Sequence, residues 1–588
     1  MPSRTPPRNT FELGLVMAGA ASAGAYTAGV MDFLFEALQV WEAAKGRAGP
    51  GVPDHGVQIR VAAGASAGGI VAALLAMLPF AGHHPMRDLA DTATPADAEN
   101  AQRNLLYKCW VTDVDIRRML ATDDLAAGRI GIPSLLNGNV LADVANDAIA
   151  AVRANLASPN IAQPPTYLAN PLQLYLCLTN MRGLPYVVSM VADETMRGHR
   201  VKSHADYGHF AVFGTGRSEP DAYVRGAIPV NWPGTVGVPD ADGWDRLRDA
   251  ALATSAFPGG FPPRPFRNPI STYRTRPDIG MAAIEGASVR LCLDLPNALD
   301  DAYDFWCVDG GLLDNEPLEF ARAALLGSAD GHAPRDARCA DKAVLLIDPF
   351  PNDLELPSSP FGSGPDLLDS VFSLIPILRQ HAAFKPRDLL LALKEDVSSR
   401  FLIAPMREEA RTGEGDLASG GLAGFAGFVH QRLRVHDFQL GRRNCQKFLR
   451  DRFSIHVSNP LVSGWVERLG REPGRLDLHH PATQHGTVDR DMVQIIPLLD
   501  EARMEVAPVP WPKLDQRIDF DPVKRLINRR AEAIAPGIVR GLLVRIGVDD
   551  HRLVNRAVQA IACDVITSRA GRSASLFVER DLRRRNLM

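Results

Sequence analysis

The sequence has few cysteines, and none of them is spaced as in a metal or redox site. Its seven cysteines among 588 residues are scattered, odd in number and never arranged as C-x-x-C. This usage suits a reducing compartment and offers no zinc framework. His479, His480 and His485 form the only histidine cluster, and it lacks H-E-x-x-H spacing. We therefore expect no bound metal and no organic cofactor.

Charge of one sign is not in excess either. The formal net charge is -4, and no dense basic stretch is joined to aromatic residues. This balance argues against a nucleic-acid binder. Nucleotide binding by a P-loop or by a G-x-G-x-x-G turn is also excluded, because neither motif is present. The hydrophobic content of 46% is that of an ordinary globular protein, and a chain of this length can bury a large core.

No segment is typical of a secretion signal or of an unbroken membrane span. The polar, proline-rich start MPSRTPPRNT lacks the basic and hydrophobic regions of a signal peptide. Residues 13–31 and 61–82 are uncharged and about long enough to span a bilayer, but each contains a glycine turn. We interpret both as buried strand–turn–helix units of a soluble α/β domain, and we expect a cytoplasmic protein.

The second of these units carries the strongest chemical motif. The apolar residues 61–63 lead into Gly64-Ala65-Ser66-Ala67-Gly68, and a small and aliphatic segment that predicts a helix follows. G-x-S-x-G between a strand and a helix forms a tight elbow that holds the serine in a rarely populated backbone conformation. The positive end of the helix then favours developing negative charge. We interpret Ser66 as a nucleophile; the alternative is a small-residue turn packed in a core.

The first unit contains a loop of small residues between an expected strand at 11–17 and an expected helix at 25–44. The loop runs from Gly19 to Gly24 as Gly-Ala-Ala-Ser-Ala-Gly. Such a loop at a helix N-terminus presents free backbone N–H groups, as an oxyanion hole does. Close packing of helix on strand explains the alanines equally well, so these residues alone do not decide between the two.

A carboxylate ends a later apolar strand. Residues 304–308 lead into Asp309-Gly310-Gly311, and a helix is expected at 318–326. An acid at a strand end with glycines behind it can be approached closely, which suits a catalytic base. The alternatives are an Asx-turn and a helix cap. Asp301 and Asp304 are rival acids, but both precede the end of the strand.

The remaining segments predict the rest of the architecture. Buried strands are expected at 172–180, 186–191 and 343–349, the last of these being the final strand of the sheet. Residues 351–365 are rich in Pro, Gly and Ser and predict a linker. Helices dominate beyond it, including 429–453, 522–534 and 537–546. We expect two domains, 11–350 and 366–588. The basic stretch 572–585 is interpreted as a solvated face, with attraction to anionic lipid as the alternative.

Together these motifs resemble those of the patatin-like phospholipases over about residues 11 to 350. In that family a glycine-rich oxyanion loop follows the first strand, G-x-S-x-G carries the nucleophile, and D-G-G or D-G-A carries the base. Residues 253–263 also look like the family's A-S-x-A-x-P-x-x-F-x-P segment. The resemblance implies a three-layer α/β fold with a central, mostly parallel sheet. The mainly helical C-terminal region has no counterpart in the minimal fold.

The resemblance also implies an activity and a set of site residues. A serine acyl hydrolase would cleave carboxylic esters of a lipid or phospholipid through a dyad of Ser66 and Asp309 and an acyl-enzyme intermediate. Peripheral contact with a membrane surface would accompany such a substrate, and the oligomeric state stays open. The family pattern assigns the oxyanion hole to Gly19, Ala20 and Ala21, and the motif glycines to Gly24, Gly64, Gly68, Gly310 and Gly311.

The oxyanion loop departs from the family pattern G-G-G-x-R-G, because Ala23 stands where the arginine is expected. An ordinary aspartate, with a pKa near ~4, is a weak base for an alcohol, so the oxyanion hole must carry much of the catalysis. We expect an active variant. The alternatives are a catalytically silent lipid- or protein-binding module, a Ser-His-Asp esterase using His332 or His381, and an acyltransferase.

Overall fold

The computed structural model describes residues 9–47, 51–87, 101–125, 131–156, 163–190, 199–217, 224, 226–231, 243–274, 276, 283–284, 287–295, 301–327, 333–350, 377, 381, 397–408, 414–469, 476, 479–481, 488–545 and 571–588. The linker predicted at 351–365 and the predicted start of a second domain at 366 lie outside these ranges. The division into two domains therefore stays a prediction.

The centre of the molecule is a sheet of eleven described strands. Their bounds are β1 Thr10–Met17, β2 Gly56–Gly64, β3 Leu168–Met190, β4 His199–Phe213, β5 Ile228–Asn231, β6 Arg264–Pro269, β7 Ala283–Ile284, β8 Ala287–Leu293, β9 Ala302–Asp309, β10 Lys342–Ile347 and β11 Arg400–Ile403. The main path runs β11-β10-β1-β2-β3-β4-β5, and it is parallel from β11 to β3. Beyond β3 the strands β4, β8 and β9 pair with it antiparallel.

Helices flank this sheet on both faces. The described α-helices are α1 Gly24–Gly46, α2 Ala67–Leu75, α4 Leu105–Tyr107, α5 Ile116–Met119, α6 Asn139–Leu156, α7 Gly243–Thr254, α8 Ile270–Arg274, α9 Leu318–Leu326, α12 Gly421–Gly424, α13 Ala426–Val429, α14 Gln431–Asp451, α15 Ser463–Leu469 and α17 Asp521–Arg545. Short 3-10 turns are η1 Ala21–Ala23, η2 Leu78–Phe80, η4 Gly310–Leu312, η5 Ala418–Gly420 and η7 Asp500–Arg503. Two turns are π-helical, η3 Lys108–Thr112 and η8 Gln516–Phe520. A separate antiparallel pair consists of β12 Ser454–His456 and β13 Met492–Gln494.

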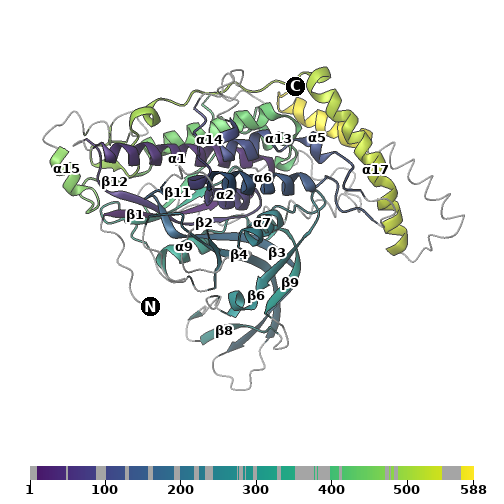
Figure 1. Ribbon diagram of the computed structural model, residues 1–588, viewed down its shortest axis with the longest axis horizontal. Helices are drawn as coiled ribbons and strands as arrows, with labels where there is room; N and C mark the ends of the chain where they lie inside the picture. Colours follow the sequence, from purple (N-terminus) through teal and green to yellow (C-terminus); the bar gives the residue numbers. More distant parts are fainter. Residues whose placement is uncertain are drawn as a thin grey trace, which may run out of the picture.

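Figure 1 shows the resulting layers, with α1, α2 and α14 on one side of the sheet and α9 on the other. Successive side chains of β1 alternate between the two faces, as the pleat of a strand requires. Leu13 and Leu15 join the large core beneath α1 and α2, whereas Val16 packs with Ala321 and Leu325 of α9. The expected α/β fold with a mostly parallel central sheet is confirmed.

Both uncharged segments that are long enough to span a bilayer are strand–turn–helix units of this core. The first is β1, η1 and α1, and the second is β2 and α2. Side chains of β1 from residue 11 on are buried, as are all of α2 except the partly buried Ile70. No helix among the described residues is long and apolar enough to cross a membrane.

Three sequence-based expectations about the elements were wrong. The strand at 343–347 is not the last of the sheet, because β11 adds parallel to it at the edge. The two strands expected at 172–180 and 186–191 form one strand, β3, which continues through a bulge where the side chain of Asn180 accepts the backbone N–H groups of Arg182 and Gly183. The helices expected on either side of Pro536 form the single helix α17.

The C-terminal region shares the main hydrophobic core with the sheet. Helix α14 crosses α1 so closely that a Cβ at Gly29 would lie 1.9 Å from the carbonyl oxygen of Phe438. Buried Arg442 of α14 pairs with Asp32 and Glu36 of α1, and its Nη2 lies 2.6 Å from a Glu36 oxygen. The side chains of this ion-pair cluster are buried between the two helices.

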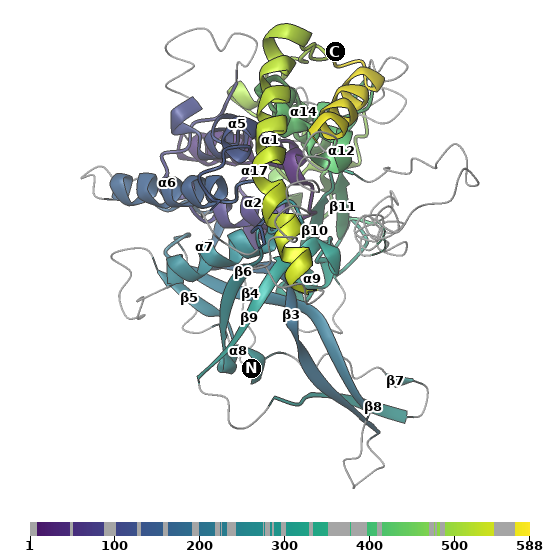
Figure 2. The same cartoon turned by 90° about the vertical axis from the view of Figure 1, so that its right-hand side faces the viewer.

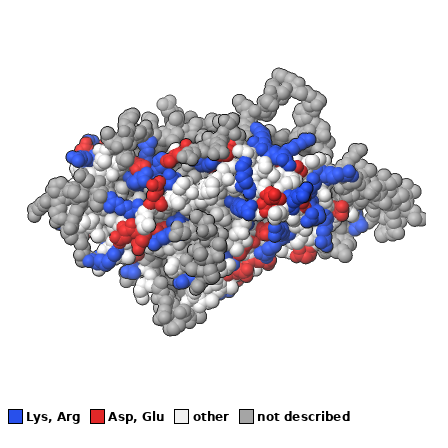
Figure 3. Space-filling model, turned by 90° about the horizontal axis from the view of Figure 1, so that it is seen from above, with Lys and Arg blue, Asp and Glu red and all other residues white. Residues whose placement is uncertain are grey.

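Helix α17 stands along one side of the molecule, close to the C-terminal helix of residues 571–584 (Figure 2). Viewed from above, Lys and Arg side chains gather toward this end, with acidic side chains among them (Figure 3). Within the C-terminal helix Arg583 pairs with Glu579, one turn earlier. The interpretation of this basic stretch as a solvated face, or as a lipid-binding one, stays a prediction.

Candidate active site

Ser66 lies in the tight turn between β2 and α2. Its φ of 51° is in the region that residues with a Cβ rarely adopt, and its backbone N–H donates to Thr254 Oγ1 at 3.0 Å. The glycines on either side allow this turn. A Cβ at Gly64 would lie 2.5 Å from the backbone of Gly68, and a Cβ at Gly68 would lie 2.1 Å from the Met17 carbonyl oxygen. The elbow expected from G-x-S-x-G is therefore the observed conformation.

The register of three strands brings Asp309 to the level of Ser66. Gly64 of β2 pairs with Leu176 of β3, and Asp309 of β9 pairs with Leu178, two residues further along β3. Ser66 is likewise two residues beyond Gly64, so both side chains emerge at the same height above β3. The hydroxyl of Ser66 donates to Asp309 Oδ2 at 2.6 Å.

Asp309 is held in a fixed orientation by its own turn. Its second oxygen, Oδ1, accepts the Gly311 N–H at 2.8 Å, and its backbone carbonyl accepts Thr179 Oγ1 at 2.8 Å. A Cβ at Gly310 would lie 2.0 Å from the Cys177 carbonyl oxygen, so this position requires glycine. The Asx-turn weighed as an alternative from the sequence is thus present, and it leaves Oδ2 directed at Ser66.

The loop from Gly19 to Gly24 runs beside the elbow. Gly19 lies against the elbow, because a Cβ at Gly19 would be 3.0 Å from the Ser66 Cβ. The Gly19 N–H donates to the Asn315 carbonyl at 3.3 Å. The backbone N–H groups of Ala20 and Ala21 have no hydrogen-bond partner among the described residues. Ala21 has a φ of 46° and lines the same pocket as Ser66. Backbone donors are therefore available on this loop at Ala20 and Ala21.

Ala23 stands at the position where the family pattern has an arginine, and Gly24 follows it. Ala23 is fully buried, and a Cβ at Gly24 would lie 2.4 Å from the ring of Trp110. The space behind the loop is thus filled by an aromatic side chain, with no cation on the loop itself.

Two residues near the site were not singled out from the sequence. Thr254 at the end of α7 accepts the Ser66 N–H. Asn315 binds Gly19 through its carbonyl, and its side-chain oxygen is buried between Gly19 and Gly311. Thr254 lies within the segment that resembles the family pattern, whereas no local signal identifies Asn315.

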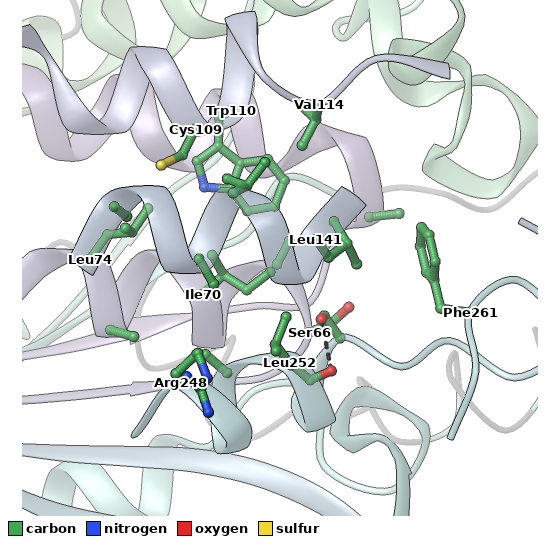
Figure 4. A pocket seen from close by; sticks show the side chains of 18 of the residues that line it. Ser66, Ile70, Leu74, Cys109, Trp110, Val114, Leu141, Arg248, Leu252 and Phe261 are labelled. Atoms are coloured by element: carbon green, nitrogen blue, oxygen red, sulfur yellow. Dashed lines mark hydrogen bonds between the residues drawn. The ribbon is translucent and has the colours of Figure 1, made fainter. Parts of the chain in front are cut away.

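An apolar pocket opens at Ser66 (Figure 4). It encloses about 970 Å³ of space, including the part open to solvent, between α2, α6 and α7. Ser66, Ile70 and Leu74 follow one another along α2 at intervals of four residues, so they line one wall. Other described lining residues include Cys109, Trp110, Val114, Leu141, Ile149, Leu247, Leu252, Phe257, Phe261, Phe425 and Phe428. The proline- and glycine-rich loop at 255–263 thus lines the pocket, as does the C-terminal region.

The described residues offer no histidine near Ser66. None of the described residues that line the pocket is a histidine, and His381 is exposed. His332 lies outside the described residues. His479 is buried against Trp465, and burial lowers its pKa to about 4. In the described part of the chain no group of three His, Cys, Asp or Glu side chains is arranged to hold a metal ion.

Comparison with known proteins places this chain in a family. The family model described as patatin-like phospholipase matches residues 15–322. The uncharacterized protein y4iI of Sinorhizobium fredii is 34% identical over 564 residues, which cover 90% of this chain and 76% of that protein. This similarity extends well beyond residue 322, so the two proteins share much of the C-terminal region as well. The chain belongs to the patatin-like phospholipases, a family of lipid acyl hydrolases.

Proposed function

We propose that the protein is a serine acyl hydrolase that cleaves carboxylic esters of lipids, with Ser66 as nucleophile and Asp309 as base. The observation that carries the proposal is the 2.6 Å hydrogen bond from Ser66 Oγ to Asp309 Oδ2 at the mouth of an apolar pocket. An alcohol hydrogen-bonded to a fixed carboxylate, beside unpaired backbone donors, is the arrangement that acyl transfer needs.

In the first step Asp309 takes the hydroxyl proton as Ser66 Oγ attacks the ester carbonyl carbon. Negative charge develops on the carbonyl oxygen, and the N–H groups of Ala20 and Ala21 supply the donors for it. Gly19 contributes by bringing the loop against the elbow. The helix α2 begins at Ala67, so its positive end adds to the stabilisation of that charge.

The leaving alcohol departs with the proton held by Asp309, and an ester joins the acyl group to Ser66. Water then attacks this ester with Asp309 again as base, which releases the acid and restores the hydroxyl. The apolar wall along α2 receives the acyl chain. From Ser66 to Leu74 this wall is about 12 Å long at the rise of an α-helix.

The test is hydrolysis of a short p-nitrophenyl ester and of phospholipid vesicles by wild type, Ser66→Ala, Asp309→Asn and Asp304→Asn. The first two variants are expected to lose about 1,000-fold or more in kcat. Asp304 is the matched control, because it lies on the same strand with a side chain that is 67% exposed. The substitution Asp304→Asn should leave turnover unchanged.

Each other outcome contradicts a stated part of the proposal. Full activity in Asp309→Asn would make this acid structural and would require another base, as in a Ser-His-Asp esterase. A wild type that hydrolyses no ester and does not react with a fluorophosphonate would favour the silent binding module. Transfer of the acyl group to an added alcohol in preference to water would make the enzyme an acyltransferase.

A further inference from the structure

The C-terminal region binds the oxyanion loop through Ser22. This serine is fully buried in η1, two residues after Ala20. Its hydroxyl donates to the Gly424 carbonyl and accepts the Gly427 N–H at 3.0 Å. One side chain on the loop thus satisfies two backbone groups that lie about 400 residues further along the chain.

The segment that meets Ser22 has no room for side chains at the contact. Gly424 has a φ of 90°, and a Cβ there would lie 3.1 Å from the Ala20 carbonyl oxygen. A Cβ at Gly427 would lie 2.6 Å from Ser22 Oγ. The segment therefore lies directly against the backbone that carries the Ala20 and Ala21 donors. Phe425 and Phe428 of the same segment line the pocket.

Arg434 of α14 holds this segment in place from behind. It is 2% exposed, and its guanidinium donates to the carbonyls of Gly427 at 2.7 Å, Phe428 at 3.3 Å and Val111 at 2.9 Å. No described carboxylate forms an ion pair with it. The carbonyls belong to the short turns α13 and η3. Burial lowers the pKa of Arg434 to about 10, so the side chain stays charged at neutral pH.

We propose that Ser22 and Arg434 are positioning residues for the oxyanion hole, and that Arg434 supports from the C-terminal region the loop whose own arginine position is Ala23. This inference rests on the proposed function. The chain of contacts runs from Arg434 to the Gly427 carbonyl, from the Gly427 N–H to Ser22 Oγ, and from Ser22 along the backbone to Ala21 and Ala20. Neither side chain touches the substrate.

A positioning role predicts a lower kcat with an unchanged KM. Deleting the Ser22 hydroxyl frees the loop, so the donors are displaced from the developing oxyanion. Arg434 still binds the Gly427 and Phe428 carbonyls, so the segment that lines the pocket stays in place. A complete loss of one oxyanion donor costs about 100- to 1,000-fold in kcat, so displacement should cost about 10- to 100-fold. The pH profile should not shift, because Asp309 and its partners are untouched.

The experiment compares Ser22→Ala with Ser419→Ala in the full-length protein. Ser419 is the matched control: like Ser22 it is fully buried and lies against Gly427, but its hydroxyl binds Asp437 of α14 instead of the Gly427 backbone. For each variant kcat and KM on a p-nitrophenyl ester and the rate of Ser66 labelling by a fluorophosphonate are measured well below its melting temperature. Arg434→Lys, which keeps the charge but not the planar fork, is expected to lower kcat and the labelling rate as Ser22→Ala does.

A selective drop in kcat and in labelling for Ser22→Ala, with Ser419→Ala near wild type, supports the positioning role. Equal losses in the two serine variants, or a raised KM with unchanged kcat in Ser22→Ala, overturn it. If wild type labels at Ser66 and Ser22→Ala labels at the same rate, the inference fails while the proposed function stands. A wild type that neither turns over nor labels overturns both.

Discussion

The two strand–turn–helix units of the core carry turns of nearly the same sequence. After β1 the chain reads Ala-Gly-Ala-Ala-Ser-Ala-Gly at 18–24, and from the last two residues of β2 onward it reads Ala-Gly-Ala-Ser-Ala-Gly at 63–68. One inserted alanine separates them. In the second turn the serine takes the positive φ of 51°, whereas in the first the extra residue, Ala21, takes it with 46°. A single residue thus decides which side chain occupies the strained position.

The two serines consequently meet different partners. Ser66 Oγ faces the pocket and donates to the Asp309 carboxylate. Ser22 is carried into the interior, where its hydroxyl joins two backbone groups of the C-terminal region. The sequences around the two serines are nearly the same, so the difference in chemistry comes from the one inserted residue and from the groups that the fold places opposite each serine. The following substitutions test that conclusion, from the largest expected effect to the smallest.

Glycines that follow the two serines should differ sharply in their tolerance of a methyl group. We expect Gly68→Ala to cost about 4 kcal/mol or more, because its Cβ would lie 2.1 Å from the backbone of Met17. The atoms nearest to a Cβ at Gly24 belong to the ring of Trp110, a side chain that can shift more easily than backbone, so Gly24→Ala should cost about 1–3 kcal/mol. Urea unfolding of both variants measures the difference. Equal stability would show that the elbow is no tighter than the oxyanion loop.

Acid should weaken the contacts of the first unit in particular. His55 is buried against Trp41 of α1 and hydrogen-bonded to the Ile495 carbonyl, and burial lowers its pKa from 6.5 to about 4. Between these pH values the unfolded chain binds more protons, so the free energy of unfolding falls as pH falls, by up to about 1.4 kcal/mol per pH unit. Helix α2 contains no titratable residue.

The check is the pH dependence of urea unfolding for wild type and His55→Gln. Above pH 6.5 the two curves should run parallel, and between pH 6.5 and 4 the variant should lose less stability per pH unit. Parallel curves over the whole range would show that His55 does not contribute to the acid sensitivity.

Replacing each serine by alanine should separate stability from turnover. Ser22→Ala leaves the Gly424 carbonyl and the Gly427 N–H buried without a partner, so we expect a loss of about 1–3 kcal/mol and a residual activity. Ser66→Ala should change stability by less than about 1 kcal/mol and abolish turnover. Thermal unfolding measures the stability of each variant, and ester hydrolysis measures its turnover. Similar stability losses in the two variants would contradict the distinction.

The smallest effect is expected at the inserted residue. Ala21→Gly relieves the strain of a Cβ at positive φ and should stabilise the protein by about 0.5–1 kcal/mol. Ala20, with a φ of -148°, is the control, and Ala20→Gly should be neutral or destabilising. The melting temperatures of wild type and the two glycine variants measure these changes in stability. If Ala21→Gly is no more stable than Ala20→Gly, Ala21 is not strained.

The parts of the fold that could be predicted from sequence are those encoded locally. Apolar runs followed by small-residue turns predicted both strand–turn–helix units, and the helix expected at 318–326 begins and ends as predicted. Asp309 was identified because an acid between a strand and two glycines is a local pattern. Its hydrogen bond to Ser66 depends on the register of β2, β3 and β9, which no single segment contains.

Long-range pairing accounts for what was missed. The four residues of β11 are too few to show a period, and their place beside β10 is set by the sheet edge. Helix α17 runs through Pro536 because both halves pack on the same loop: Arg530 donates to the Leu135 carbonyl, and Gly537 packs against Gly131. The hydroxyl of Ser22 gave no signal either, since its partners lie in a region with no counterpart in the minimal fold.

The contact between Ser22 and Gly424 also sets an order in time. The two residues are 402 positions apart in the chain. At a synthesis rate of ~5–20 residues per second, Ser22 is incorporated about 20 to 80 s before Gly424. Ser66 and Asp309 both precede Gly424, so both are synthesised before it. If Ser22 positions the loop as proposed, we expect a newly made molecule to reach full activity only after the segment around Gly424 has been synthesised and has packed against that loop.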